Sequence, residues 1–450
     1  MMCKEINADT IFSNTGNKYS LGEKIGKCGQ GIIYSTENNE FITKLYYPTG
    51  KSEIDENIIE KIKYIKDTNA PKNFAPIIDV IEQPYIGYVM EKENGYKTLN
   101  SYLVPDKGCS VHEWYNKGLG LYERLFVGYI IAKAFENMEK QYLYFCDIST
   151  DNIFVKIDKN SAIKITDIDD IYTPGKGIST NPDSTRYTAP EIAKGLRCPD
   201  VLSDNYSLAV LLYELLRVGH PYSSDKNSIN MLPAEIVFTE EISRLFERCF
   251  VDGCANRAHR PSASEFQNAF LKATNKIVKC PNCGAWHYLI KKEKEWRNCP
   301  WCDFETKPKA IIYFYDMLFA GEDYKTIDPN ECLSSKLEDL FVIKENRRNR
   351  IKGFYFFKNS ESIKLPSIRE NYLTIVHNEK GYYVYNEFSK EGIVIKRFKT
   401  GQFNKLDYKK ALLLQNGDEI YFEVNDSDAT KIECAGHTYS YVKMAKFMEV

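Results

Sequence analysis

An aspartate placed five residues before an asparagine is the strongest chemical signal in this sequence. Asp147 and Asn152 follow the apolar stretch at 143–145, and Asp167 lies 15 residues after Asn152 at the end of a strand-like segment. A carboxylate can take a proton from a hydroxyl group, and carboxylate and amide oxygens are ligands that Mg²⁺ prefers. The spacing fits one general base and two magnesium ligands that act on a phosphate group.

Glycines near the N-terminus could lie against such a phosphate. Gly26, Gly29 and Gly31 fall in a turn between two strand-like segments, where the missing side chains let backbone N–H groups approach an anion. Taken alone, a glycine-rich hairpin is more often a simple turn. A phosphate-covering loop is therefore one interpretation, and a plain turn is the other.

Lys44 lies on the next strand-like segment, 13 residues after Gly31. A lysine that faces the interior needs a carboxylate partner, and the following helical segment offers Glu56 and Glu60. Glu60 is favoured because Tyr64, one turn later, gives the apolar neighbour expected beneath an ion pair. The competing interpretation is a solvated lysine and a solvated helix face.

Two Cys-x-x-Cys pairs form a second chemical signal. Cys280 with Cys283 and Cys299 with Cys302 are separated by 15 residues. Each pair makes a tight knuckle that aims two thiolates at one point, so the pairs complete a tetrahedral Zn²⁺ site with no open position. Redox-active cysteines are the competing interpretation, which the lack of a thioredoxin-like βαβ pattern disfavours. We expect a structural zinc ribbon, with His287 as an exposed strand residue between the knuckles.

The composition argues against several classes of protein. The 450 residues include 60 basic and 62 acidic side chains, so the net charge of -2 provides no basic excess to attract nucleic acid or an anionic membrane. The apolar stretch 207–216 has about half of the roughly 20 residues that cross a bilayer, and it reads as a buried core helix. The first residues show no export signal, and the 13 cysteines, an odd number, suit reduced thiols. We expect a cytoplasmic protein with neither a nucleic-acid nor a membrane partner.

Changes of pattern divide the chain. Residues 18–95 read as short strands with one helix, and from about residue 99 the apolar residues recur at helical spacing, most clearly over 121–140. Beyond about residue 345, aromatic and β-branched stretches alternate with turns, which predicts an all-β sandwich. The predicted parts are a catalytic domain at 1–275, a zinc ribbon at 276–308, a connecting segment at 309–345 and the β-sandwich at 346–450.

Taken in order, these motifs resemble the eukaryotic-type serine/threonine protein kinases, in particular a divergent bacterial branch. The resemblance covers roughly residues 15–273 and continues through Thr188-Ala189-Pro190-Glu191, then Asp204, then His259-Arg260-Pro261. In that family, Asp204 would head a buried helix and Arg260 would pair with Glu191. The resemblance implies an α+β fold class, with a bilobal protein-kinase fold followed by the zinc ribbon and the C-terminal all-β sandwich.

The resemblance also implies ATP and Mg²⁺ as cofactors and gives roles to individual residues. Asp147 would accept the proton of the substrate hydroxyl, while Asn152 and Asp167 would bind Mg²⁺. Lys44, oriented by Glu60, would hold the α- and β-phosphates beneath the glycine turn. The implied nucleotide-binding residues are Gly26, Gly29, Gly31, Ile33, Lys44, Met90 at the gatekeeper position, and Glu91 and Glu93, whose backbone would meet the adenine edge.

Three residues near these positions depart from the family pattern. Cys146 replaces the arginine that usually precedes the base, so we hypothesise that phosphorylation of the activation segment does not switch activity. Ser149 replaces the usual lysine and removes one positive charge near the transferred phosphoryl group, which predicts a slower reaction. Asp169 replaces the glycine that usually follows Asp167 by two residues.

The C-terminal segment carries a narrower resemblance. Ser389 with Gly392, and Gly417 with Asp418, resemble motifs of the forkhead-associated (FHA) domain, which binds phosphothreonine. The arginine that this family uses for phosphate is not evident, so a protein-docking role is preferred over phosphothreonine binding. The bacterial branch named above includes kinases encoded beside phosphatases and von Willebrand-type proteins, and such a neighbour is an expected partner.

Together these features predict an enzyme that transfers the γ-phosphate of ATP to serine or threonine of a partner protein, with the zinc ribbon and FHA-like domain as docking modules. The alternative is a pseudokinase that binds nucleotide without turnover and acts as a scaffold or adaptor. A small-molecule kinase is a third interpretation, which the Ala-Pro-Glu segment at 189–191 disfavours.

Overall fold

In the computed structural model the chain forms two compact units, Met1–Thr274 and Asn275–Val450. The first unit ends next to the position 275 at which the sequence places the end of the catalytic domain. The residues that the structure describes are 6, 8–27, 30–48, 52–68, 73–92, 94–104, 108–145, 148–157, 162–166, 171–172, 186–222, 231–289, 298–320, 334–345, 347–352, 355, 371–387, 393–422, 430–434 and 437–450.

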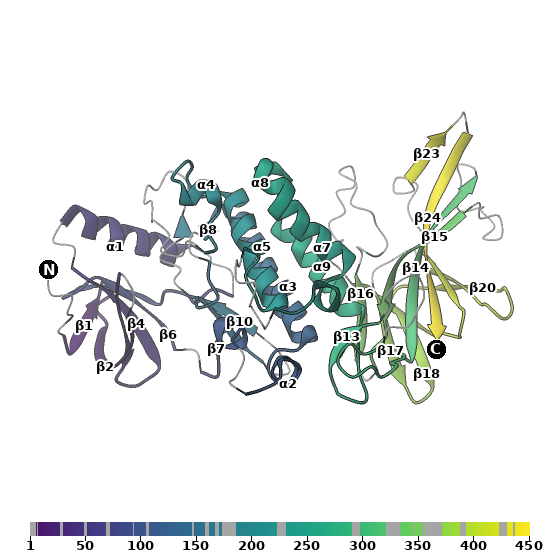
Figure 1. Ribbon diagram of the computed structural model, residues 1–450, viewed down its shortest axis with the longest axis horizontal. Helices are drawn as coiled ribbons and strands as arrows, with labels where there is room; N and C mark the ends of the chain where they lie inside the picture. Colours follow the sequence, from purple (N-terminus) through teal and green to yellow (C-terminus); the bar gives the residue numbers. More distant parts are fainter. Residues whose placement is uncertain are drawn as a thin grey trace. The chain divides into compact units, whose positions relative to one another are not determined.

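A closed six-stranded barrel forms the N-terminal lobe of the first unit (Figure 1). Alternating apolar residues such as Ile11, Ile32 and Leu45 fill its interior. The strand order β1-β2-β3-β4-β6-β5 is closed because β1 pairs with β5. The strands are β1 (Thr10–Ser13), β2 (Lys18–Lys27), β3 (Gly31–Thr36), β4 (Phe41–Tyr46), β5 (Asp79–Gln83) and β6 (Gly87–Glu91).

Asp79 of β5 ties the turn after β1 to the barrel. Its carboxylate is 2% exposed and accepts hydrogen bonds from Thr15 (3.0 Å), Asn17 (2.9 Å) and Tyr19 (3.1 Å). Burial alone would raise the pKa of Asp79, but these hydrogen bonds outweigh it and lower the pKa below its ordinary value. Burial, and next in size the hydrogen bond to Asp79, raise the pKa of Tyr19 to about 12.

A single long helix, α1 (Ser52–Asp67), accompanies the barrel (Figure 1). Ile62 and Ile65 are buried, at the helical spacing that the sequence predicts for this segment. Lys66 near its end places its ammonium 3.5 Å from the Asp79 carboxylate, which adds a charged partner to that buried group.

Helices dominate the second lobe of the first unit. The helix α5 (Val201–Arg217) begins with a capping box between Asp200 and Ser203, and most of its side chains are buried. The apolar stretch 207–216 is therefore a buried core helix, as predicted. The remaining elements are β7 (Lys97–Thr98), a 3₁₀ turn (Leu99–Tyr102), α2 (Val111–Lys117), α3 (Leu121–Glu139), β8 (Tyr144–Phe145), β9 (Ile153–Lys156), β10 (Ala162–Ile165), β11 (Ile171–Tyr172), α4 (Pro190–Ala193), α6 (Ala234–Val237), α7 (Glu240–Glu247), a π-helix (Arg248–Asp252), α8 (Gly253–Ala255), a 3₁₀ turn (Arg257–His259) and α9 (Ala263–Asn275).

Arg124 of α3 is a buried cation at the centre of this lobe, 1% exposed. Its guanidinium donates to the backbone carbonyl oxygens of Leu119 (2.7 Å), Leu215 (2.7 Å) and Tyr102 (2.8 Å). It also lies 4.5 Å from the centroid of the Tyr115 ring. Burial lowers the pKa of Arg124 to about 10. The carbonyl dipoles and the ring stabilise the charge of the guanidinium in a place where water does not reach it.

The second unit contains two antiparallel sheets and a short two-stranded ribbon (Figure 1). Seven strands form the larger sheet, in the order β15-β14-β24-β22-β19-β20 with β23 paired to β24, and four form the other, in the order β16-β17-β18-β21. The strands are β12 (Ile277–Lys279), β13 (Trp286–Tyr288), β14 (Ala310–Ala320), β15 (Ser334–Val342), β16 (Arg348–Lys352), β17 (Asn371–Asn378), β18 (Gly381–Asn386), β19 (Ile393–Lys396), β20 (Phe403–Leu406), β21 (Ala411–Leu413), β22 (Glu419–Phe422), β23 (Thr430–Cys434) and β24 (His437–Glu449).

The prediction that residues 309–345 form a connecting segment is wrong. Its residues form β14 and β15, and β14 pairs along its whole length with β24, from Ala310 opposite Glu449 to Ala320 opposite Tyr439. The partner strand lies more than 100 residues later in the chain, so no local pattern reveals it. This segment therefore belongs to the sheet itself. Contacts such as that between the rings of Tyr382 in β18 and Phe447 in β24, 5.3 Å apart, join the two sheets.

No helix among the described residues is both long enough and apolar enough to cross a lipid bilayer.

Candidate active site

The strand that leads to Asp147 is anchored to the core helix α5. The backbone N–H of Phe145, in β8, donates a 2.8 Å hydrogen bond to the Asp204 carboxylate in the first turn of α5. Burial raises the pKa of Asp204 well above its ordinary value. Asp204 thus heads a buried helix, as the resemblance implies, and it holds the chain immediately before the predicted catalytic loop.

Asn152, one of the two predicted magnesium ligands, lies at one end of a β-hairpin. β9 and β10 form a hairpin in which Ile153 is opposite Ile165, and the backbone N–H of Thr166 donates to the carbonyl oxygen of Asn152 at 2.9 Å. This pairing brings the residue before Asp167 to the residue that the sequence names as the other ligand. Asn152 and Thr166, 14 residues apart in sequence, therefore share one end of the hairpin.

Lys44 and the predicted nucleotide-binding residues line up across the barrel. In register, Gly26 faces Ile33, Ile33 faces Lys44, and Lys44 faces Tyr88. Residues directly opposite on neighbouring strands point to the same side of a sheet, so these positions share one face. Met90, two residues after Tyr88 on β6, lies on that face too and is 3% exposed.

Gly31 begins β3 and marks a very close approach of two strands. A Cβ at this position would lie 2.1 Å from the carbonyl oxygen of Leu45, so the pairing with β4 excludes a side chain. Glu91 ends β6 and is exposed there, opposite Phe41. Gly31 and Glu91 therefore lie opposite the two ends of β4, at Tyr46 and Phe41.

The predicted partner of Lys44 does not lie beside it. Lys44 is 2% exposed and its Nζ atom lies 5.6 Å from the centroid of the Tyr46 ring, whereas Glu60 and Glu56 are exposed on α1. The buried face of α1 carries Ile62, and Glu60 falls on the other side of the helix. The sequence argument failed here because helical spacing fixes which residues share a face but not which face meets the sheet.

Several predicted site residues lie outside the described residues: Gly29, Glu93, Asp147 and Asp167, together with Cys146 and Asp169. Ser149 is described. Its carbonyl oxygen accepts a 3.3 Å hydrogen bond from the backbone N–H of Asn152, which makes a tight turn of the segment between the predicted base and the predicted ligand.

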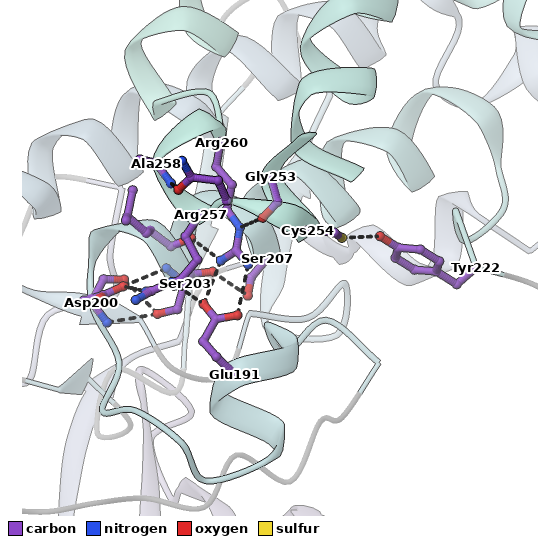
Figure 2. A network of polar contacts seen from close by, with 12 residues as sticks. Glu191, Asp200, Ser203, Ser207, Tyr222, Gly253, Cys254, Arg257, Ala258 and Arg260 are labelled. Carbon is purple, nitrogen blue, oxygen red and sulfur yellow. Dashed lines mark hydrogen bonds and ion pairs between the residues drawn. The ribbon is translucent and has the colours of Figure 1, made fainter. Parts of the chain in front are cut away.

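A network of arginines and carboxylates anchors the segment that contains Ala189-Pro190-Glu191 (Figure 2). Arg260 donates two parallel hydrogen bonds to Glu191, at 2.7 and 2.9 Å, and also contacts the carbonyl oxygens of Leu202 and Gly253. Desolvation alone would raise the pKa of Glu191, but the bonds from Arg260 outweigh it and lower the pKa. The predicted pairing of Glu191 with Arg260 is confirmed.

Arg257 extends this network beyond what the sequence predicts. Its Nε atom lies 2.9 Å from Glu191, and its guanidinium also bonds to Asp200, the residue that caps α5 (Figure 2). The only sequence signal was its position three residues before Arg260, one helical turn away. Two arginines thus clamp one carboxylate to the start of the core helix.

A second network, missed by the sequence reasoning, joins the catalytic loop to the segment before Ala189. The hydroxyl of Thr150 lies 3.3 Å from that of Tyr187, which donates to the Glu214 carboxylate; Arg186 also pairs with Glu214. Thr150, Tyr187 and Glu214 are each 5% exposed or less. Burial, and then the Glu214 charge, raise the pKa of Tyr187, so this phenol stays protonated and can act as a donor.

The four predicted zinc ligands converge in the second unit. The Sγ atoms of Cys280, Cys283, Cys299 and Cys302 all lie within 4.8 Å of one another, with 3.6 Å between the first and fourth and between the second and third. Disulfide sulfurs would be about 2 Å apart. Zn–S bonds of about 2.3 Å in a tetrahedron place sulfurs about 3.8 Å apart, so the donor set fits Zn²⁺.

The two cysteine pairs have the same backbone geometry. In each, the N–H of the residue four positions after the first cysteine donates to its carbonyl oxygen, from Gly284 to Cys280 and from Asp303 to Cys299, both at 2.8–2.9 Å. Gly284 and Asp303 both have positive φ, 76° and 58°. The repeated left-handed turn aims both sulfurs of each pair at one point.

His287 was expected to be exposed, and this is wrong. It is 0% exposed on β13, and its Nδ1 atom lies 3.0 Å from the carbonyl oxygen of Tyr288. The ribbon packs onto the larger sheet through Val278, Leu289 and Ile311, which explains why a strand that looks solvated in the sequence has a buried side.

Two of the residues quoted for the FHA resemblance, Gly417 and Asp418, lie in a turn of the second unit. Asp418 is 0% exposed and accepts hydrogen bonds from Arg397 Nη1 (2.6 Å), the N–H of Gln415 (2.9 Å) and the N–H of Phe398 (3.2 Å). The Asp418 carboxylate therefore accepts its hydrogen bonds from groups of this chain and faces the protein interior. Ser389 and Gly392 lie outside the described residues.

Comparison with known proteins agrees with this geometry. A family model, the protein kinase domain, matches residues 19–277. A Clostridium perfringens protein named "probable serine/threonine-protein kinase" is 23% identical over 291 residues, 59% of this chain and 39% of that protein. Protein kinase YegI of Escherichia coli is 20% identical over 374 residues, 72% of this chain and 54% of that protein.

Serine/threonine-protein kinase PknD of Chlamydia caviae is 24% identical over 256 residues, 50% of this chain and 27% of that protein. The chain thus spans about half or less of the length of these curated relatives. The kinase-domain match at residues 19–277 covers more than half of the chain and contains the Glu191–Arg260 clamp, the Asp204 anchor and the strand row of Lys44. The chain belongs to the protein kinase family.

Proposed function

We propose that this protein transfers the γ-phosphate of ATP to serine or threonine of a partner protein. The observation that supports it most directly is the 2.9 Å hydrogen bond from the Thr166 N–H to the Asn152 carbonyl oxygen, because Thr166 directly precedes Asp167, the other residue proposed to bind Mg²⁺. The Phe145–Asp204 bond holds the strand before the proposed base, Asp147, against the core. Both contacts hold backbone segments next to the proposed catalytic residues, which suits a reaction that depends on positioning.

ATP and Mg²⁺ would be held by the residues that share the barrel face and the hairpin end. Lys44, already buried, would lie against the α- and β-phosphates, and the turn from Gly26 to Gly31 would cover them. Asn152 and Asp167 would coordinate Mg²⁺, which neutralises charge that develops on the transferred phosphoryl group. Asp147 would accept the hydroxyl proton of the substrate.

The test is transfer of labelled phosphate from ATP with Mg²⁺ to casein and to the chain itself. The intact protein is compared with Asp147→Asn, and Asp151→Asn serves as the matched control because Asp151 lies in the same loop and is exposed. Label that disappears in Asp147→Asn and remains in Asp151→Asn supports the proposal. Equal labelling by both variants contradicts the role of Asp147.

A nucleotide-binding adaptor is the second candidate, favoured by one observation. Glu60 is exposed on α1 while Lys44 is buried, so Glu60 does not hold the lysine as it would in the proposed active kinase. A protein that binds ATP, shown by a thermal shift that Lys44→Met removes, but labels no acceptor would support this candidate. Measurable transfer that depends on Asp147 would exclude it.

We also propose that the four cysteines bind one structural Zn²⁺. The sulfur positions fit a tetrahedron, and all four ligand positions are taken by protein, so the ion would stabilise the ribbon and not act on a substrate. Metal analysis of the purified chain should find one zinc per chain, and Cys280→Ser with Cys302→Ser should remove it. A chain that keeps its fold and contains no zinc would contradict this.

The second unit is proposed to dock a partner protein. Phosphothreonine binding is the less favoured role because Asp418 is spent on Arg397 and backbone N–H groups and the phosphate-binding arginine of the FHA family has no counterpart in the sequence. A phosphatase or a von Willebrand-type protein encoded nearby remains the proposed partner, and co-purification of the two expressed together would test this.

A further inference from the structure

The hairpin of β19 and β20 presents an unusual surface on the second unit. We define the basic hairpin surface as Lys396, Phe398, Lys399, Phe403, Lys405 and Lys446. Phe398 is 64% exposed and Phe403 is 51% exposed. Four of the exposed large hydrophobic side chains of this unit fall within residues 398–413 alone, because Tyr408 and Leu413 follow the hairpin. Clustered exposure of this kind marks an interaction site more often than scattered single residues do.

The charge of the same stretch is strongly positive. Residues 396–410 contain six basic side chains and one acidic side chain, whereas the whole chain has a net charge of -2. Arg397 is occupied by the buried Asp418, and Lys446 lies 3.8 Å from Glu419. Lys399 and Lys405 form no ion pair with any carboxylate in the described part of the chain. The surface therefore complements an acidic partner.

An ammonium group lies over each of the two exposed aromatic rings. Phe398 packs on Gly417, where a Cβ would lie 2.7 Å from its Cγ, and Lys446 Nζ lies 5.6 Å from its ring centroid. Lys396 is directly opposite Phe403, with its Nζ atom 5.9 Å from that ring. Rings that each have an ammonium group over them meet an acidic protein surface better than they insert between lipids, because insertion would bury that charge.

β20 is also the last strand of the larger sheet. An edge strand offers backbone groups to an extended segment of another protein, and its lysines discourage pairing with a second copy of itself. We propose that the basic hairpin surface binds an extended, acidic segment of a partner protein that contains aromatic residues. This rests on the docking role proposed for the second unit, and it names the surface and the chemistry of the ligand.

The test uses the full chain without nucleotide and a fluorescent random copolymer of glutamate and tyrosine as the probe, with poly-glutamate for comparison. Fluorescence anisotropy should show binding that weakens as salt rises. The copolymer should bind more tightly than poly-glutamate, because the rings of Phe398 and Phe403 contact its tyrosines. Lys399→Glu with Lys405→Glu should weaken binding roughly tenfold, and Phe398→Ser with Phe403→Ser by a similar factor.

Two matched variants control for general effects. Lys380→Glu reverses an exposed charge at the β17–β18 turn of the other sheet, and it should leave binding unchanged. Because Phe398 packs on Gly417, its replacement can disturb the turn, so the exposed lysine variants decide the result if the phenylalanine variant unfolds.

Several outcomes would overturn the proposal. These are no binding of the copolymer, equal loss with Lys380→Glu, or binding only to vesicles containing 30 mol% phosphatidylserine, which would make the surface a membrane contact. Phosphate transfer to casein is measured on the same variants. It should not change, so a failure of docking is distinguished from a failure of the kinase reaction.

Discussion

The side-chain hydroxyls of Thr150 and Tyr187 lie 3.3 Å apart in the buried interior of the kinase unit. Thr150 belongs to the loop between the proposed base and Asn152, and Tyr187 belongs to the end of the activation segment. Since Tyr187 also donates to Glu214 of α5, the loop and the segment share one anchor on the core helix. This contact needs no phosphate, which agrees with the cysteine at position 146 in place of an arginine.

Removal of this contact should slow the reaction. Thr150→Val keeps the shape of the side chain but leaves the Tyr187 hydroxyl without one partner, a change of about 1 kcal/mol, which corresponds to roughly a fivefold lower kcat. The KM for ATP should stay the same because the barrel face is untouched, and Thr150→Ser should restore the rate. Steady-state kinetics on casein measures all three. Equal kcat values for the valine and serine variants would contradict a positioning role.

The Glu191–Arg260 clamp should be a main source of stability for the first unit. Arg260→Met leaves a nearly buried carboxylate with half of its partners, which should cost about 3 kcal/mol. Arg257→Met should cost less, because the Arg257 side chain is 18% exposed and Arg260 still covers Glu191. Pulse proteolysis in urea measures the fraction of each unit that is unfolded, because the two units give different protease-resistant fragments. Equal losses in the two variants would show that the bidentate geometry does not matter.

Asp79 should make the N-terminal lobe sensitive to acid. Its pKa in the folded protein lies below the ordinary value of 3.8, so its contribution is fully present above that value and is lost as the pH falls through the folded pKa. The difference in unfolding free energy between the intact protein and Asp79→Asn should not change with pH around pH 6, and it should shrink below about pH 4. Urea unfolding at several pH values measures this difference. Glu82→Gln, at a partly exposed ion pair with Lys63, should show no comparable change.

The buried Arg124 should tolerate no apolar replacement. Arg124→Met fills a similar volume but leaves the carbonyl oxygens of Tyr102, Leu119 and Leu215 without their donor, so we expect a loss of about 3 kcal/mol. Lys133→Met, at an exposed position of the same helix, is the matched control and should change stability by less than about 0.5 kcal/mol. Thermal unfolding of both variants tests this, and an unchanged midpoint for Arg124→Met would contradict it.

Motif order and local spacing were good guides where a known motif marks the residues that make the contact. The order of motifs predicted the Glu191–Arg260 pair and the Asp204 helix, and both are found. The cysteine spacing predicted that four sulfurs meet, which they do within 4.8 Å. Tight turns fix each cysteine pair within a few residues, whereas Glu191 and Arg260 are 69 residues apart, so the family pattern supplied that pair.

Spacing failed where burial depends on elements that are distant in sequence. The exposure of Glu60, the buried side of His287 and the strand β14 in the segment expected to be a connector were all mispredicted. Helical periodicity predicts which residues share a face of α1, but packing decides which of its faces turns toward the barrel. Likewise, β14 is a strand because β24 pairs with it, and no window of sequence contains both.

The sequence by itself determined the family, the residue types of the predicted catalytic loop and the four-cysteine set, because those depend on motifs with fixed residue types and spacing. Only the tertiary structure decided how the barrel closes through β1, which carbonyls surround Arg124, and how Thr150 reaches Tyr187. The physical reason is that a contact between distant residues depends on how whole elements pack, and packing free energy is shared over many side chains that no single motif contains.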